Sequence, residues 1–81
     1  MIKRYGMYVW TVETPLHNLQ VRTVMCTDAD QLATARYFVY NLDDPQEACV
    51  FIIKDMPLMK KALRMFDQDI PVETVKGYLE L

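Results

Sequence analysis

The sequence predicts a small α+β domain: a three-stranded antiparallel sheet in a ββαβ arrangement, followed by one or two short C-terminal helices. Three observations predict this fold. Residues 2–14 and 19–26 are rich in aromatic and β-branched residues that alternate with period two. Residues 28–42 place apolar side chains at helical intervals. Residues 47–54 are apolar on both faces, which is typical of a strand covered on both sides. A chain of 81 residues is expected to form a single domain, 1–81.

The first two strands are predicted to form a hairpin. Residues 2–14 are the first strand, with a bulge or bend at Gly6. Residues 14–18 are the turn, since Pro15 cannot extend a ladder and Asn18 tolerates a left-handed backbone. We expect the lone histidine, His17, to be solvated in this turn. Cys26 and Cys49 are the only cysteines, and we expect two buried thiols without a disulfide.

The stretch "CTDADQLATARYFVYNLDDP" contains two acid pairs that flank the predicted helix 28–42. Thr27 and Asp30 approximate a capping box, and acids in a first turn complement the helix dipole. The side chains expected to face the sheet are spaced three or four residues apart: Leu32, Ala35, Val39 and Leu42. The second pair, Asp43 and Asp44, ends the helix before Pro45. We therefore interpret these acids as helix boundaries and predict no metal site.

Two further helices are predicted near the C-terminus. Asp55 is the expected cap of the first, with Pro57 in its opening turn. Residues 71–80 fit a short helix or a strand, and the helix is favoured. For the sheet, the helical crossover makes the second and third strands parallel, and the first strand fits between them. The predicted order is 2-1-3, antiparallel throughout, with two open edges where another chain can add a strand.

Composition and motifs disfavour several functions. The net charge of −2 and the pI of about 5.2 disfavour nucleic acid. The longest apolar run, residues 48–53, is too short to span a bilayer, and no signal-peptide core follows Met1, so a cytoplasmic protein is expected. No catalytic constellation, glycine-rich phosphate loop or zinc-ligand spacing is present. We expect a non-enzymatic protein without metal or cofactor.

The strongest candidate binding residues lie on the back of the predicted helix 28–42. With its apolar stripe toward the sheet, Tyr37 and Tyr40 fall to one side, beside Arg36. Tyrosine and arginine are enriched at interface hot spots. We expect these three residues to contact a partner protein, with a homodimer left open. The alternative is that the tyrosines pack beneath the C-terminal helices.

A competing function uses residues 58–79, whose outline of helix, acidic turn and helix resembles a helix-turn-helix. In this alternative the chain is a small DNA-binding transcriptional regulator. A basic set supplies the nucleic-acid contacts: Lys60, Lys61, Arg64 and Lys76. The turn lacks the usual glycine, so a plain αα-hairpin with a solvated basic face is the preferred interpretation.

The stretch "TVMCTDADQLATARYFVYN", residues 23–41, resembles the Dmd family of small antitoxins from T-even phages. The shared residues, which follow a strand ending in Thr and Met, are Gln31, Ala33, Thr34, Tyr37 and Asn41. The resemblance covers about a quarter of the chain, and the residues after the third strand depart from the family. It implies a phage-encoded inhibitor that docks on a host toxin or defence enzyme in the host cytoplasm. Small phage anti-defence proteins, including anti-CRISPRs, are similar in size, acidity and lack of catalytic motifs.

Overall fold

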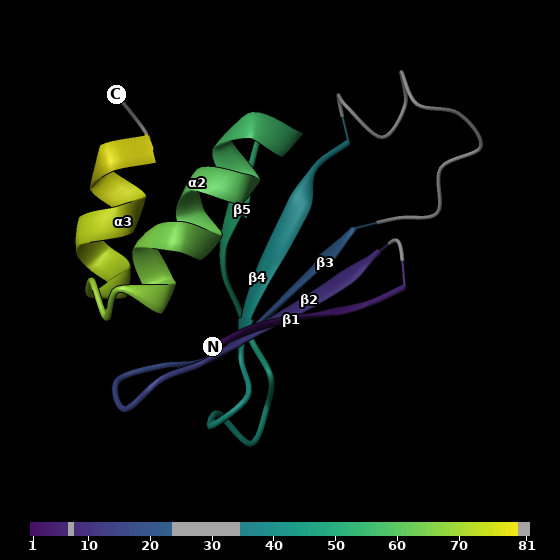
Figure 1. Ribbon diagram of the computed structural model, residues 1–81. Helices are drawn as coiled ribbons and strands as arrows, with labels where there is room; N and C mark the ends of the chain where they lie inside the picture. Colours follow the sequence, from purple (N-terminus) through teal and green to yellow (C-terminus); the bar gives the residue numbers. More distant parts are fainter. Residues whose placement is uncertain (7, 24–34, 80–81) are drawn as a thin grey trace.

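The computed structural model describes residues 1–6, 8–23 and 35–79, and it shows an α+β fold. An open five-stranded antiparallel sheet has the order β1-β2-β3-β4-β5, and two helices follow it (Figure 1). The elements are β1 (Ile2–Tyr5), β2 (Val9–Glu13), β3 (Asn18–Thr23), β4 (Tyr37–Asn41), β5 (Cys49–Ile53), α2 (Met56–Asp67) and α3 (Val72–Leu79). The predicted three-stranded sheet of order 2-1-3 is therefore wrong, because the strands follow one another as a meander.

The first difference from the prediction lies at Gly6. The segment 2–14 is two strands, β1 and β2, paired antiparallel with Tyr5 opposite Val9. Gly6 has a φ of +72°, a left-handed backbone that glycine adopts without steric cost. A left-handed residue at this point reverses the chain, so the expected bulge is a hairpin turn. The next hairpin, between β2 and β3 around residues 14–17, is confirmed.

The second difference lies in the predicted helix 28–42. Its last part is strand β4, paired with β3 on one side and β5 on the other. Tyr37, Phe38, Val39 and Tyr40 are all good strand formers, and hydrogen-bonded neighbours on both sides override a helical spacing of apolar residues. The expected cap at Thr27, Asp28 and Asp30 lies outside the described residues. Asp43 and Asp44 do not end a helix: they lie in the turn after β4, where Gln46 N donates to Asp44 Oδ1 at 2.9 Å.

The meander explains the error in strand order. β3 and β5 are both antiparallel to β4, so they run parallel with one strand between them. The prediction placed the N-terminal strand in that slot. β4 fills it, and the residues of β4 were predicted to be part of a helix. β1 lies instead at one edge of the sheet and β5 at the other.

The two C-terminal helices agree with the sequence. Asp55 caps α2, since its Oδ1 accepts a hydrogen bond from Leu58 N at 3.0 Å, and Pro57 lies in the first turn. α2 ends at Asp67; beyond its C-cap, Asp69 has a left-handed φ of +61°, and Ile70 N donates back to Met65 O at 3.1 Å. The favoured helix within residues 71–80 is confirmed as α3.

The described core lies on one face of the sheet, beneath both helices (Figure 1). Tyr37 and Phe66 are its largest fully buried side chains, and Tyr37 meets Trp10 edge to face with ring centroids 5.8 Å apart. The prediction that β5 is covered on both faces is wrong for the described residues, since Ile52 on the opposite face is 55% exposed. Cys49, expected to be buried, is also exposed. Cys26 lies outside the described residues.

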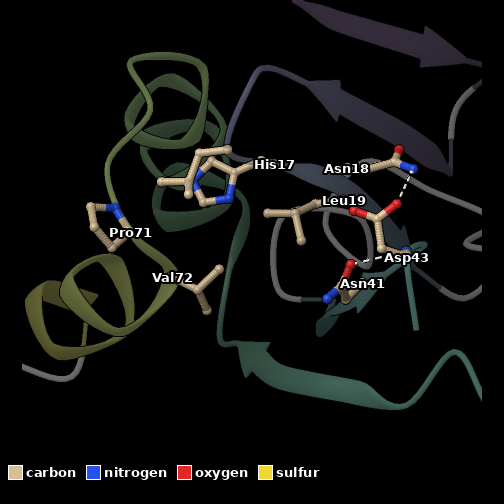
Figure 2. Close-up of a pocket in the computed structure, with 8 residues that line it drawn as sticks. His17, Asn18, Leu19, Asn41, Asp43, Pro71 and Val72 are labelled. Atoms are coloured by element: carbon tan, nitrogen blue, oxygen red, sulfur yellow. Dashed lines mark hydrogen bonds between the residues drawn. The ribbon is translucent and has the colours of Figure 1, made fainter.

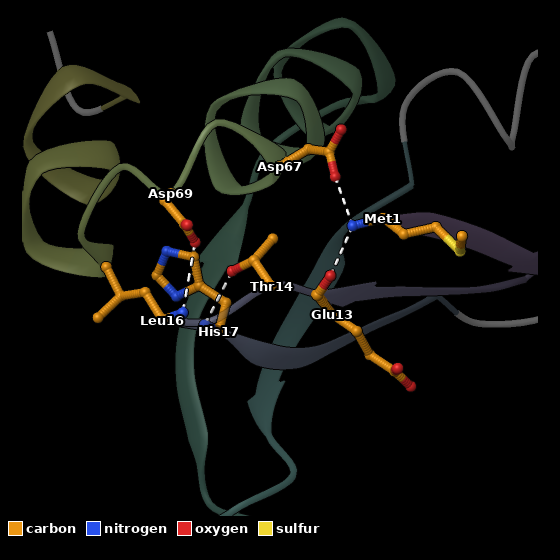
Figure 3. A network of polar contacts seen from close by, with 7 residues as sticks. All are labelled: Met1, Glu13, Thr14, Leu16, His17, Asp67 and Asp69. Carbon is orange, nitrogen blue, oxygen red and sulfur yellow. Dashed lines mark hydrogen bonds and ion pairs between the residues drawn. The ribbon is translucent and has the colours of Figure 1, made fainter.

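His17 is buried rather than solvated, and it connects the β2–β3 turn to the helices. It is 6% exposed, and its Nε2 donates to the Ile70 carbonyl oxygen at 2.6 Å. The imidazole also meets the Phe66 ring edge to face at 5.3 Å. Figure 3 shows two further contacts between the same layers: the Met1 amino group lies 2.7 Å from an Asp67 carboxylate oxygen, and Leu16 N donates to Asp69 at 3.4 Å. The prediction that His17 is solvated was wrong because α2 and α3 fold back over the turn.

The burial of Tyr37 leads to a stability prediction. Truncating Tyr37→Ala removes a fully buried ring, and we expect it to lower the free energy of unfolding by about 3–5 kcal/mol. Tyr40→Ala, on the half-buried opposite side of the same strand, is the matched control and should cost much less. Urea unfolding followed by circular dichroism measures both. Equal losses for the two variants would contradict the placement of Tyr37 in the core.

The hydrogen bond of His17 leads to a second prediction. His17→Phe keeps a ring against Phe66 but leaves the Ile70 carbonyl without its donor. We expect a loss of about 1–3 kcal/mol, the usual cost of an unsatisfied buried polar group. Thermal and urea unfolding of this variant, beside Leu16→Ala at the exposed neighbouring position, measure the effect. A His17→Phe protein as stable as the wild type would show that this hydrogen bond contributes nothing.

Candidate functional site

The candidate site is the sheet face opposite α2 and α3; no helix among the described residues covers it, and it is called here the helix-free face. Successive side chains of a strand point to opposite faces, so the neighbours of core residues such as Val21 and Val39 belong to it. The strand register arranges them in two rows across the strands. The first row is Tyr5, Val9, Arg22, Phe38 and Ile52. The second row is Lys3, Thr11, Gln20 and Tyr40, and it ends at the register shift between β4 and β5.

The first row is apolar except at its centre. Tyr5 and Ile52, at its two ends, are 57% and 55% exposed, while Val9 and Phe38 are half-buried. Exposed large apolar side chains that stand singly are ordinary on protein surfaces. Here each has a half-buried apolar neighbour in the same cross-strand row, so an apolar pair lies on either side of Arg22, and exposed apolar area of this kind marks interaction sites. The helix-free face therefore combines apolar area with one central cation.

That cation, Arg22, is held in place from several sides. Its guanidinium carbon lies 4.3 Å from the centroid of the Tyr40 ring, a cation–π contact. Its Nε donates to Gln20 Oε1, and a terminal nitrogen lies 3.7 Å from a Glu47 carboxylate oxygen. The side chain nevertheless stays 38% exposed. An arginine fixed by its own protein loses little conformational entropy when a partner contacts it.

Thr11 lies beside this cluster in the second row and carries an unusual hydroxyl. Its side-chain oxygen is buried and, within the described part of the chain, has no hydrogen-bond partner. An orphan buried hydroxyl costs on the order of 1–3 kcal/mol, so stable folds contain few of them. The register places it between Lys3 and Gln20. The helix-free face thus includes a polar group that the described residues leave unsatisfied.

The structure separates the three residues predicted to bind a partner. Tyr37 and Tyr40 are three residues apart in a strand, so their side chains point to opposite faces. Tyr37 is in the core, whereas Tyr40 stacks with Arg22 on the helix-free face. Arg36 is exposed just before β4, and its Nη1 donates to the Lys54 carbonyl oxygen at 2.6 Å. Of the predicted trio, Tyr40 is the member that belongs to the helix-free face.

The basic residues of the alternative function lie in the helix layer. Lys60 and Arg64 are exposed on α2, and Lys76 is half-buried on α3. Lys61 is half-buried, with its Nζ 4.3 Å from the Tyr78 ring centroid. A hydrogen bond from Lys61, and then its positive charge, lowers the pKa of Tyr78 from its ordinary value of 10.0. Lys61 is thus already engaged within the helix pair.

A small cavity of about 190 Å³ opens where the β2–β3 turn meets the start of α3 (Figure 2). His17, Leu19, Asn41, Asp43, Pro71 and Val72 are among its lining residues. Most of its polar groups already have structural partners: Asn18 donates to Asp43 at 3.1 Å, and Asp43 N donates to Asn41 Oδ1 at 3.0 Å. A general base must reach a nucleophile, and the His17 Nε2 is committed to a backbone carbonyl. The cavity does not assemble catalytic groups.

The described residues contain no group of three or more His, Cys, Asp or Glu side chains that could hold a metal ion. None of the helices among them is long and apolar enough to cross a membrane. No protein-family model, curated protein or solved structure matches the chain.

The helix-free face was missed from the sequence because its residues come from all five strands. Arg22 and Tyr40 are far apart along the chain, and only the register of β3 against β4 brings them together. A local signal did exist at residues 37–40, where aromatic and β-branched residues that favour strands follow one another. The spacing of Leu32, Ala35, Val39 and Leu42 predicts a helix over the same residues, and this prediction conflicts with the strand.

The contact between Lys61 and Tyr78 gives a prediction on pH. The ammonium group stabilises the tyrosinate, so the pKa of Tyr78 lies below its ordinary value and Lys61→Met should raise it. Lys60→Met, at the exposed neighbouring position, is the matched control and should leave it unchanged. NMR titration of the tyrosine Cζ resonances, with Tyr78→Phe for assignment, measures the change. A Tyr78 titration that Lys61→Met does not move would contradict the contact.

Proposed function

We propose that this chain is a small, non-enzymatic protein-binding module whose docking surface is the helix-free face. The observation that carries the proposal is the row of five residues that ends in exposed Tyr5 and Ile52 and has Arg22 at its centre. Aromatic and arginine side chains provide most hot-spot energy in protein interfaces. The partner that fits is a protein surface of apolar side chains with a polar rim.

The rigidity of the surface supports the proposal. Arg22 lies on β3 and Tyr40 on β4, and each of these central strands is hydrogen-bonded to a neighbouring strand on both sides. Side chains that are already ordered lose little entropy on binding, so more of their contact energy appears as affinity. None of these features calls for a reaction.

The finer part of the proposal concerns the partner. The resemblance of residues 23–41 to the Dmd family supports a phage-type inhibitor that docks on a host toxin or defence enzyme. β4, which contains Tyr37 and Asn41 of that resemblance, also supplies Tyr40 to the helix-free face. We therefore propose a bacterial protein as the partner, bound in the cytoplasm of the host.

The experiment compares three baits in a bacterial lysate. A protein retained by the wild type should be lost by the double variant Arg22→Ala/Tyr40→Ala and retained by Lys60→Ala/Arg64→Ala on the helix layer. Calorimetry with the captured protein should then show that Arg22→Ala/Tyr40→Ala weakens binding by at least about 2 kcal/mol, the hot-spot threshold. Both variants replace two side chains by alanine, so a difference in binding between them reports on the face that was changed.

The same variants test the alternative function. If the chain is a DNA-binding regulator, it will bind mixed-sequence duplex DNA with an affinity that falls steeply between low and moderate salt. Lys60→Ala/Arg64→Ala would then abolish binding, and Arg22→Ala/Tyr40→Ala would not. That pattern, or undiminished protein binding by Arg22→Ala/Tyr40→Ala, would overturn the proposed docking surface.

A further inference from the structure

The two edges of the sheet differ in their ability to pair with a second chain. Among the described strands, β1 has β2 as its one neighbour and β5 has β4, so each presents an unpaired row of backbone groups. Such an edge is a template for strand addition unless charges, bulges or covering segments block it. β1 contains Lys3 and Arg4, whereas Cys49–Ile53 contains no charged residue. β5 has an irregular register at Cys49, but its regular stretch from Phe51 to Ile53 has no charge to protect it.

We propose that β5 pairs antiparallel with the β5 strand of a second copy of this chain, giving a two-fold symmetric dimer with one continuous sheet. The two-fold axis that makes an antiparallel pair from two copies stands perpendicular to the sheet, so residues of the same face lie opposite each other. The axis must therefore pass near one residue, which lies opposite its own copy.

The axis is placed by the regular part of β5. The register between β4 and β5 is irregular at Val39 and Tyr40, so the undisturbed pairs are those of Phe51, Ile52 and Ile53. Ile52 is the middle residue of this stretch. An axis at Ile52 puts Ile52 opposite Ile52 on the helix-free face and Phe51 opposite Ile53 on the helix side. Ile52 is 55% exposed in the single chain, and the pairing buries it against its own copy.

Placing the two-fold axis at the centre of the other edge strand, β1, gives an unfavourable pairing. In β1 an axis at Lys3 places Lys3 opposite Lys3, and an axis at Arg4 places Arg4 opposite Arg4. Like charges directly opposite each other in a sheet are destabilising. For β5 the corresponding pairs are isoleucine with isoleucine and phenylalanine with isoleucine, which are favourable. The two central axes of β1 are thus unfavourable, whereas the central axis of the regular part of β5 is favourable.

The dimer uses Ile52 at the end of the helix-free face and leaves the rest of that face uncovered. Ile52 is the last residue of the first row, so the rows of the two copies meet end to end at the axis. Arg22 and Tyr40 lie on β3 and β4, away from the new interface. A continuous sheet then presents two copies of the docking surface side by side, which permits bivalent binding.

The first measurement is the oligomeric state by sedimentation equilibrium over a range of concentrations. The wild type should be a dimer at high concentration, and Ile52→Lys should raise the dimer dissociation constant about tenfold or more. Tyr5→Lys is the matched control, since Tyr5 ends the same row at the other edge with nearly the same exposure, 57% against 55%. It should leave the dimer unchanged, with circular dichroism confirming that both variants fold.

A second variant tests the register without introducing a charge. Residues directly opposite in antiparallel strands have Cα atoms about 4.5–5.5 Å apart, within the range of a disulfide. Mild oxidation should therefore cross-link Ile52→Cys into a covalent dimer, while the wild type and Tyr5→Cys should not cross-link. A wild type that stays monomeric, a dimer lost equally in Tyr5→Lys, or equal cross-linking of Tyr5→Cys would overturn the proposal.

Discussion

Phe66 is the side chain on which the rest of the structure depends. It is fully buried near the end of α2, and its ring contacts His17 at 5.3 Å and Phe51 at 6.2 Å between centroids. His17 belongs to the β2–β3 turn and Phe51 to the edge strand β5, so one ring joins three parts of the chain. The hydrogen bond from His17 to Ile70 then holds the segment between the helices against the same turn. Together these contacts keep α2 on one face of the sheet.

The one-sided arrangement of the described helices decides which surface is left for binding. α2 and α3 are 12 and 8 residues long, and their apolar sides join a single core with the strands. A domain of this size buries a limited share of its apolar surface within one chain. The remaining apolar side chains of the sheet, Tyr5 and Ile52 above all, stay exposed on the other face. This exposed apolar area is the basis of the proposed docking surface.

The two faces of the molecule offer different chemistry. On the helix-free face, Arg22 is fixed by Tyr40, Gln20 and Glu47, and apolar residues extend from it to both edges. On the helix layer, Lys60 and Arg64 are exposed, and Lys61 is engaged by Tyr78. An ordered aromatic and arginine cluster suits recognition of a protein, whereas isolated surface cations contribute mainly long-range attraction. This contrast is the physical basis for preferring a protein partner.

The sequence by itself determined the features that depend on near neighbours. Asp55 and Pro57 begin α2, the hairpin turn lies around residues 14–17, and α3 follows Pro71, because caps and turns are formed by residues close together in the chain. Tertiary structure decided the rest. Residues 37–41 fit both helical and strand spacing, and they became β4 because β3 and β5 supply hydrogen bonds on both sides. The burial of His17 and the pairing of Arg22 with Tyr40 likewise arise between segments distant in sequence, whose contacts no local pattern contains.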